Sequence, residues 1–576
     1  MQIPERSLAR ASVVPAALPS LVVPAALPIL VVAAALLLVV AFWLVVLPED
    51  GFQLVRTPAD QLGVAPHELR LGLASWILGL PAALLLVWGG SRLFRFEALA
   101  SRPPLSPKHF ALFMWVAALL GLGVVRYLVL GEGPLTDDEW AYHFQARTFA
   151  QLDLAVPPPP DLRRFDYTFL TVRDGKWFCY LQPGLALLMA PGVWLLDDPF
   201  LSLWPIHAAL VPATYLAARR LLGETWDLVS RRAALLVLFA PTYLLMGATV
   251  EPYAAFALLL LVVAFAGSLA LSGQRTASVS LGAVLGLMLL TRPLEFGVVG
   301  LCTGLVFLWS GLRGGARLPL IRGTAFALLG FLPFAGFQLV YNDALMGDPF
   351  TLPMTATQSQ VFWGFGAHVY KNHDLGGALV LWGGNLFRLS FWLALGPLSV
   401  VLIVFAQSRR ACPPGVSGPR RLILVFCALL LAALLPYSMA GVADFGPAYL
   451  FVLVAPLSVC VALSLGGLRP SPVMAMAIST STLTILPYVL MQAHLIAINA
   501  STPYEAVPDE TKPSLVLVRR HQASPTGWVF GIMAPSPALD DRVIFAWATP
   551  EDLRPGGLEA IQARLPGLHI TTLELH

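Results

Sequence analysis

Charged residues are scarce in this chain of 576 residues: 12% are Asp, Glu, Lys or Arg, whereas 57% are apolar. Lysine occurs only at Lys108, Lys176, Lys371 and Lys512, so most of the positive charge is arginine. The net charge of +3 is small and scattered over loops, without the clustered basic face that binds nucleic acid. We therefore expect no nucleic-acid partner. A soluble fold is not expected either, because it would need a core larger than single domains usually build.

Cysteine is also rare. The five cysteines form no CxxC motif and no paired spacing, and three of them fall inside apolar runs. Neither a disulfide framework nor a zinc site is indicated. We assign no metal ligands from the sequence, and a divalent cation, Mg²⁺ or Mn²⁺, stays open as a cofactor.

Long apolar runs are what the sequence has instead. A hydrocarbon core about 30 Å thick is crossed by roughly 20 apolar residues. The first run follows Arg6 and Arg10 and is too long for a signal-peptide core, so it predicts an uncleaved span. The fold class predicted is an all-α polytopic membrane protein with about 13 transmembrane helices. The apolar segments lie at 16–47, 71–90, 109–131, 200–219, 231–249, 252–272, 278–292, 294–312, 320–341, 378–406, 421–441, 446–467 and 471–496.

One further apolar stretch, 185–196, is too short for an ordinary span and predicts a short span, a re-entrant hairpin or an interfacial helix. Short cytoplasmic loops collect Lys and Arg, and this rule can decide the topology. If 185–196 does not cross, the arginine clusters within 92–102, 219–232 and 409–421 all fall on the cytoplasmic side. We therefore predict that it does not cross.

This topology places three large segments outside. They are a first outer loop at 131–183, a second outer loop at 341–377 and the tail at 499–576. The tail has ordinary polarity, with short β-like runs and the helix-like stretch "GLEAIQARL". We expect it to form a small extracytoplasmic α/β domain. Residues 1–108 then hold two N-terminal transmembrane helices, and 109–498 form the main transmembrane domain.

The densest group of charges is in "LTDDEWAYHFQAR", where Asp137, Asp138 and Glu139 directly follow an apolar run. A turn with Gly and Pro precedes them, and the aromatic residues after them suit a helix that lies along the membrane interface. A carboxylate held there can act as a general base toward a hydroxyl or an amine, or can bind a cation that neutralises a phosphate. A solvated loop is the alternative, and these residues alone leave both open.

Three cationic side chains are expected at a similar depth in the membrane. Lys176 is in the first outer loop, Arg292 joins two apolar segments, and Arg388 lies in an apolar helix after the second outer loop. Ionisable groups near the bilayer are costly and tend to mark function. A lipid-linked phosphate would need cations here. Solvation of Lys176 and snorkelling of Arg388 are the alternatives.

Several motifs follow in order over most of residues 109–467. They are "GPLTDDEWAYHFQAR", "YLQPGLALLMAPGVWLL", "YLAARRLLG", "LLTRPLEFG", "YNDALMGDPFTLP", "RLSFWLALGPLSV" and "DFGPAYLFVLVAP". In this order they resemble the GT-C superfamily of polytopic glycosyltransferases, specifically the branch with protein O-mannosyltransferases and the bacterial aminoarabinose transferase.

The resemblance implies an inverting membrane glycosyltransferase. Its donor would be a sugar on a polyprenyl-phosphate carrier, and its acceptor a glycan, a lipid or a protein. Transfer would occur on the extracytoplasmic face of the bacterial cytoplasmic (inner) membrane. Asp138 would be the catalytic base or the carboxylate that positions the acceptor, with Glu139 in support. The other expected site residues are Asp137 and Tyr142 for the acceptor or a cation, Lys176, Arg292 and Arg388 for the donor phosphate, and Tyr180, Gln182, Tyr341 and Asn342 for the donor groove.

Two positions depart from the pattern. Gln182 precedes Pro183 where aminoarabinose transferases have Lys, and Ala448 stands where relatives often have Arg. Other functions stay open. A transporter or flippase of lipid-linked sugars would often show repeated halves, which the sequence lacks. A polymerase or ligase of lipid-linked oligosaccharides would usually rely on a later loop. A catalytically inactive scaffold is the last alternative.

Overall fold

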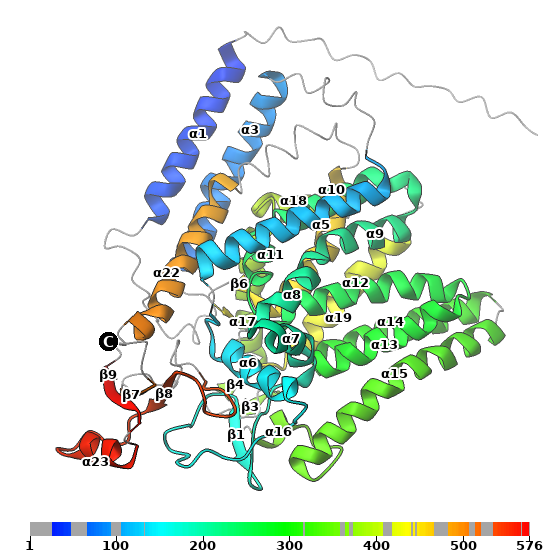
Figure 1. Cartoon of the computed structure of the whole chain (residues 1–576). Coiled ribbons are helices and arrows are strands. Elements are labelled where there is room, and N and C mark those ends of the chain that lie inside the picture. Colours follow the sequence, from blue (N-terminus) through cyan, green and yellow to red (C-terminus); the bar gives the residue numbers. More distant parts are fainter. Residues whose placement is uncertain are drawn as a thin grey trace, which may run out of the picture.

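The computed structural model is mostly helical (Figure 1). It describes residues 26–47, 66–93, 105–131, 133–314, 317–357, 363–367, 372–406, 417–438, 442–443, 446–465, 482–505, 513–519, 534–565 and 567–574.

Seven helical segments within these ranges are long and apolar enough to span a membrane. A bent pair, α17 (Leu375–Trp392) with α18 (Pro397–Ala406), would make an eighth and turns by 103° at its break. The seven segments involve α1 (Ala26–Val46), α2 (Pro66–Ala74) with η1 (Ser75–Gly79) and α3 (Leu80–Leu93), α5 (Pro107–Val124) with η2 (Val125–Leu130), α8 (Pro199–Ala208) with α9 (Leu210–Leu222), α12 (Pro252–Leu271), α14 (Pro293–Gly314) and α15 (Arg317–Met346).

The remaining helices are shorter or less apolar. They are α6 (Asp137–Ala150), α7 (Pro183–Leu196), η3 (Glu224–Trp226), α10 (Asp227–Leu238), α11 (Pro241–Met246), α13 (Arg275–Thr291), α16 (Pro353–Thr357), α19 (Ser417–Leu434), η5 (Ala448–Leu453), α20 (Val454–Ser464) and α22 (Ile485–Glu505).

The structure thus confirms a helical, multi-pass architecture but gives fewer candidate spans than the sequence predicts. The expected span at 231–249 breaks at Pro241 into α10 and α11, because proline cannot continue the helix hydrogen bonds. Much of the expected span at 471–496 lies outside the described residues. The 14 residues of α7 reach about 21 Å, less than the roughly 30 Å of a hydrocarbon core.

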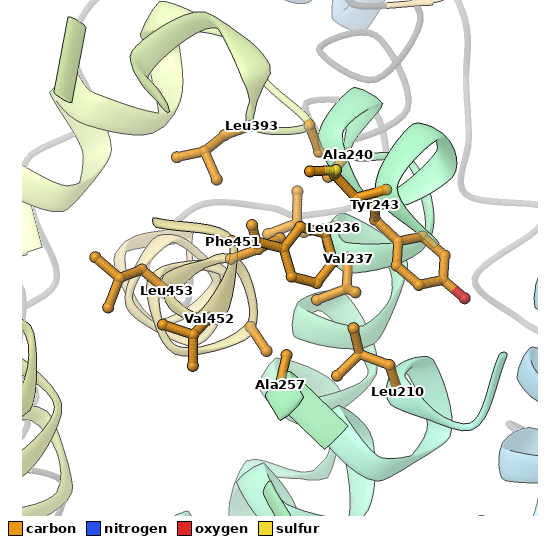
Figure 2. Packing of buried hydrophobic residues seen from close by; sticks show 14 of the residues in the cluster. Leu210, Leu236, Val237, Ala240, Tyr243, Ala257, Leu393, Phe451, Val452 and Leu453 are labelled. Atoms are coloured by element: carbon orange, nitrogen blue, oxygen red, sulfur yellow. The ribbon is translucent and has the colours of Figure 1, made fainter. Parts of the chain in front are cut away.

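The interior of the helical part is close-packed. Figure 2 shows Phe451 of η5 packed near Val237 of α10 and Leu210 of α9, so a late segment of the chain joins two earlier helices. Glycines allow α13 and α15 to touch backbone to backbone. A Cβ on Gly282 would lie 1.7 Å from the Ala327 carbonyl oxygen, so any larger residue would force the two helices apart. This packing holds α13 against α15, and Arg292 directly follows the last residue of α13.

A second apolar core joins the loop at 131–183 to the C-terminal segment and to parts of α7, α8 and α15. The loop and the C-terminal segment lie low in Figure 1. In the loop, β1 (Leu170–Arg173) and β2 (Lys176–Cys179) form an antiparallel hairpin. Both residues of its turn, Asp174 and Gly175, have positive φ, as tight hairpin turns require. Trp177 and Phe178 of the hairpin share the core with Phe545 of the C-terminal segment.

The C-terminal segment is a small α/β unit. Its three strands are all parallel in the order β8-β7-β9, and α23 connects β8 to β9, which lie on opposite sides of β7. The elements are β7 (Ser514–Arg519), β8 (Val543–Trp547), α23 (Gly557–Arg564) and β9 (His569–Glu574); the short pairs elsewhere are β3 (Gly366–Ala367) with β4 (Asn372–His373) and β5 (Val442–Ala443) with β6 (Gly446–Pro447).

The N-terminal helices pack against the rest of the chain through α2. A Cβ on Gly72 would lie 2.3 Å from the ring of Phe387, so only glycine lets α2 approach α17 this closely. Trp76 Nε1 donates to Ser390 Oγ at 3.0 Å beside this contact. Specific contacts from α2 and η1 therefore hold the N-terminal helices against α17.

Candidate functional site

The three adjacent acids form the first turn of α6. Thr136 caps this helix, since its Oγ1 accepts a hydrogen bond from the Glu139 backbone N–H at 3.2 Å. Carboxylates in the first turn are stabilised by the positive end of the helix dipole. The start of a helix is therefore a favourable place for all three acids, although their side chains have different surroundings.

Glu139 is fully buried, and both of its carboxylate oxygens are occupied. One accepts from the Leu135 backbone N–H. The other accepts from the Val250 backbone N–H at 2.7 Å, across 111 residues. The Glu139 side chain therefore anchors the start of α6 to the segment between α11 and α12.

A further buried acid, Glu251, lies beside this anchor. Its Oε1 accepts from Thr136 Oγ1 at 3.0 Å, and the residue is 4% exposed. The sequence shows Glu251 only as a lone acid in the turn "TVEPYAA". It is missing from the expected site residues because its partner is 115 positions away.

Asp138 has a different environment from its two neighbours. It is half-buried, and its carboxylate accepts a bond from its own backbone N–H. Burial and the adjacent charge of Glu139 raise the pKa of Asp138 to about 7, against the opposing effect of the Arg292 cation. A carboxyl group that titrates near neutrality is suited to accept a proton at physiological pH.

Arg292 lies between α13 and α14. Its guanidinium carbon is 4.6 Å from the ring centre of Tyr253 and 4.9 Å from that of Tyr449. Both Nε and Nη2 are 2.5 Å from one oxygen of Glu295. The Tyr449 hydroxyl lies 3.1 Å from that of Tyr437. The two aromatic rings and the Glu295 carboxylate therefore restrain the guanidinium from several sides.

The wall beside Asp138 joins α6, the end of β2 and α15. Gln145 Nε2 donates to Tyr341 Oη at 2.8 Å and to the Leu181 carbonyl at 3.2 Å. Burial and the charge of Asp138 raise the pKa of Tyr142 well above its usual value, so Tyr142 stays a hydroxyl donor. Gln182 begins α7, and its Oε1 is buried without a hydrogen-bond partner among the described residues.

The remaining expected residues fall into two groups. Asp137 and Tyr180 are half-buried, Asp137 at the start of α6 and Tyr180 with its ring 5.8 Å from Phe169. Three others already have strong partners: Lys176 donates to the Ala344 carbonyl at 2.6 Å, Asn342 donates to the Pro349 carbonyl at 2.8 Å, and Arg388 pairs with Glu68.

The positive charge of Arg292 influences several groups of the site. The charge of Arg292 acts on Asp138, Tyr142 and Glu251. These groups come from α6, from the start of α12 and from the α13–α14 junction. No group of three or more His, Cys, Asp or Glu side chains placed to hold a metal is found within the described ranges.

No protein-family model matches the sequence, and no curated protein matches it significantly. The structure is similar to that of ArnT from Cupriavidus metallidurans bound to undecaprenyl phosphate, with 14% identity, a TM-score of 0.48 and coverage of 80% of this chain and 89% of that one. The apo state of ArnT gives a TM-score of 0.46 at 14% identity, over 79% of this chain and 89% of that one. The apo oligosaccharyltransferase of Archaeoglobus fulgidus gives 0.38 at 14% identity, over 70% of this chain and 59% of that one. At these identities and TM-scores, the activities of ArnT and of the oligosaccharyltransferase are not carried over to this chain.

Proposed function

We propose that this protein is a membrane glycosyltransferase that moves a sugar from a polyprenyl-phosphate carrier to an acceptor on the extracytoplasmic face of the bacterial cytoplasmic membrane. The observation that carries the proposal is the environment of Asp138, which begins α6 shortly after the apolar span of α5 and η2, has a pKa of about 7 and is acted on by the charge of Arg292. A lipid-linked phosphate keeps its chain in the bilayer and its sugar at headgroup depth, where such a base and such a cation are needed.

Asp138 is assigned the role of general base. Its carboxylate takes the proton of an acceptor hydroxyl or amine as the acceptor atom attacks the anomeric carbon. The bond from that carbon to the phosphate oxygen breaks on the opposite face, and the carrier leaves as a polyprenyl phosphate. The product is therefore inverted at the anomeric carbon, and the proton stays on Asp138.

Arg292 is assigned to the phosphate of the donor. Negative charge grows on that phosphate as the sugar leaves, and a guanidinium held in one plane stabilises it without reorganising. Glu295, Tyr253 and Tyr449 hold the guanidinium in place. Arg292 is preferred to Arg388 and Lys176 because, although it pairs with Glu295, it is the cation whose charge acts on Asp138.

Asp137 and Tyr142 are assigned to the acceptor, and Tyr180 with Gln182 to the donor groove. The orphan Oε1 of Gln182 is an acceptor for a sugar hydroxyl. Tyr341 and Asn342 are both buried and hydrogen-bonded, so their proposed part is to hold the wall of the groove. The C-terminal α/β unit is placed on the same outer side as the first loop, because the two share one core.

Reconstitution tests this assignment. Purified protein in liposomes is given polyprenyl-phosphate sugars labelled in the sugar, and release or transfer of the label is measured. Asp138→Asn should abolish turnover, while Asp153→Asn, the same change at an exposed position later in the loop, should not. Label that crosses the bilayer on an intact carrier would instead identify a flippase. Repeating the assay with EDTA and with added Mg²⁺ or Mn²⁺ decides the need for a cation.

A further inference from the structure

Helix α6 has two functional faces. Residues three or four positions apart share one face of a helix. The face toward the proposed site carries Asp138, Tyr142 and Gln145. The next face carries Glu139, His143 and Arg147. Glu139 holds the first turn through Val250, as described above, so the question is what holds the last turn.

Arg147 joins three separate parts of the chain at the end of α6. Its Nε and Nη2 donate to the two oxygens of Asp197, at 2.9 and 2.6 Å, where α7 ends. Its Nη1 donates to Asp541 Oδ1 at 3.1 Å, in the C-terminal unit. A planar guanidinium that makes a two-point contact with one carboxylate and a third bond to another has little rotational freedom.

Asp197 is the centre of this junction. His143 Nε2 lies 3.4 Å from Asp197 Oδ1, on the same face of α6 as Arg147. Partial burial raises the pKa of Asp197, but the proximity of His143 and the bonds from Arg147 outweigh it and keep that pKa well below the usual range. Asp197 is therefore charged at physiological pH, and the junction persists there.

The C-terminal unit is a firm support for this contact, not a loose tail. Arg164 of the first loop pairs with the buried Asp552 at 2.6 Å. Trp547 donates twice to the same loop, from its backbone N–H to the Arg164 carbonyl and from Nε1 to the Asp166 carbonyl, both at 2.9 Å. Asp541 is thus held in a fixed position against α6.

We infer that the C-terminal α/β unit is a positioning element of the transfer site, which acts through Asp541 and Arg147 on the last turns of α6. Arg147 is the positioning residue, since it touches no reacting atom and acts by keeping the direction of Asp138 and Tyr142. The inference rests on the proposed function, because it gives a role at that site to a part of the chain outside it. The first turn is held by Glu139 and the last by Arg147, so α6 is clamped at both ends.

The size of the effect follows from geometry. A misplacement of the reacting groups by about 1 Å can cost up to about 100-fold in rate. Asp541→Asn leaves one neutral oxygen where the carboxylate accepts from both Arg147 and the Ser536 backbone N–H, so the restraint on Arg147 weakens while the helix stays in place. We expect this variant to lower kcat about 10-fold with the donor KM nearly unchanged. Asp541→Glu keeps the charge and should restore most of the rate.

The experiment uses the full chain and two readouts. Hydrogen exchange of the backbone amides of residues 143–150 is compared with turnover of the labelled polyprenyl-phosphate sugar. The matched control is Glu551→Gln, which removes an exposed pair with Arg163 of the same loop but does not touch α6. Asp541→Asn should speed exchange in the last turns of α6 and lower kcat, whereas the control should change neither.

Two results would overturn the inference. Unchanged exchange and unchanged kcat in Asp541→Asn would show that Asp541 does not restrain α6. Equal losses in Asp541→Asn, Asp541→Glu and the Glu551→Gln control would show a general loosening of the domain. If the wild-type protein transfers no sugar, the proposed function fails, and the exchange measurement still decides whether the clamp exists.

Discussion

Arg388 donates two hydrogen bonds to the carboxylate of Glu68, from Nε to Oε1 at 2.9 Å and from Nη2 to Oε2 at 2.5 Å, across 320 residues of sequence. Arg388 is fully buried in α17, and Glu68 lies in the first turn of α2. Beside them, Asn385 accepts a further bond from Arg388 Nη1. The pair ties the N-terminal helices to the main helical body.

Removing one partner of this pair should destabilise the protein strongly. Glu68→Gln leaves the Arg388 charge buried without its partner, and such losses cost about 3–5 kcal/mol. The thermal midpoint in detergent should fall clearly for either single variant. The double variant Glu68→Gln with Arg388→Gln should recover part of the loss, because no unpaired charge remains. Losses that simply add in the double variant would mean that the two residues do not stabilise each other.

Asp138 and Glu139 are neighbours with opposite expected behaviour. Asp138→Asn should abolish sugar transfer and leave the thermal midpoint nearly unchanged. Glu139→Gln should lower the midpoint, because an amide offers only one oxygen where two backbone N–H groups need an acceptor, at a cost of about 1–3 kcal/mol. Both variants are measured in the same detergent. A stable, inactive Glu139→Gln would reverse this assignment of roles.

The raised pKa of Asp138 predicts the pH dependence of turnover. A general base must be deprotonated, so activity should rise with pH through about 7. About a tenth of the molecules have a charged Asp138 at pH 6 and about nine tenths at pH 8. The measurement is kcat of the reconstituted protein between pH 5 and 9. A profile that is flat from pH 5 upward would indicate an Asp138 with an ordinary pKa.

The sequence predicts much of the helical framework, because apolar runs and proline positions are local properties. It predicts the acidic start of α6 and places Arg292 at a boundary between two apolar segments. The sequence alone does not show that Glu139 is a structural anchor and Asp138 is not. That difference comes from the hydrogen bond that Glu139 accepts from the Val250 backbone N–H, which is distant in sequence. The predicted site residues do not include Glu251 or Glu68, again because their contacts are made over long distances in sequence. Their partners, Thr136 and Arg388, are distant in sequence, and a single sequence carries no pairing signal.

Arg292→Lys tests whether the guanidinium group matters beyond its charge. Lysine keeps the cation, but its single ammonium cannot bond Glu295 with two nitrogens and present a planar pair of donors to a phosphate. We therefore expect the donor KM to rise about 10-fold. Arg173→Lys, at an exposed position on the β1–β2 hairpin, is the control. Equal KM values for both variants would remove the assignment of Arg292 to the phosphate.

Gly184→Ala tests the contact between the start of α7, close in sequence to Gln182, and the end of α13, which Arg292 directly follows. A Cβ at position 184 would lie 2.5 Å from Thr291 Oγ1 and 2.7 Å from the Leu290 carbonyl carbon, and backbone atoms cannot move aside cheaply. The start of α7 should therefore shift away from the end of α13, at a cost of about 1–3 kcal/mol in stability. Because the shift separates Gln182 from the phosphate site, the donor KM should rise as well. Gly133→Ala, where an added Cβ meets nothing within 4 Å, is the control. A lower thermal midpoint with an unchanged KM would place the donor groove away from this contact.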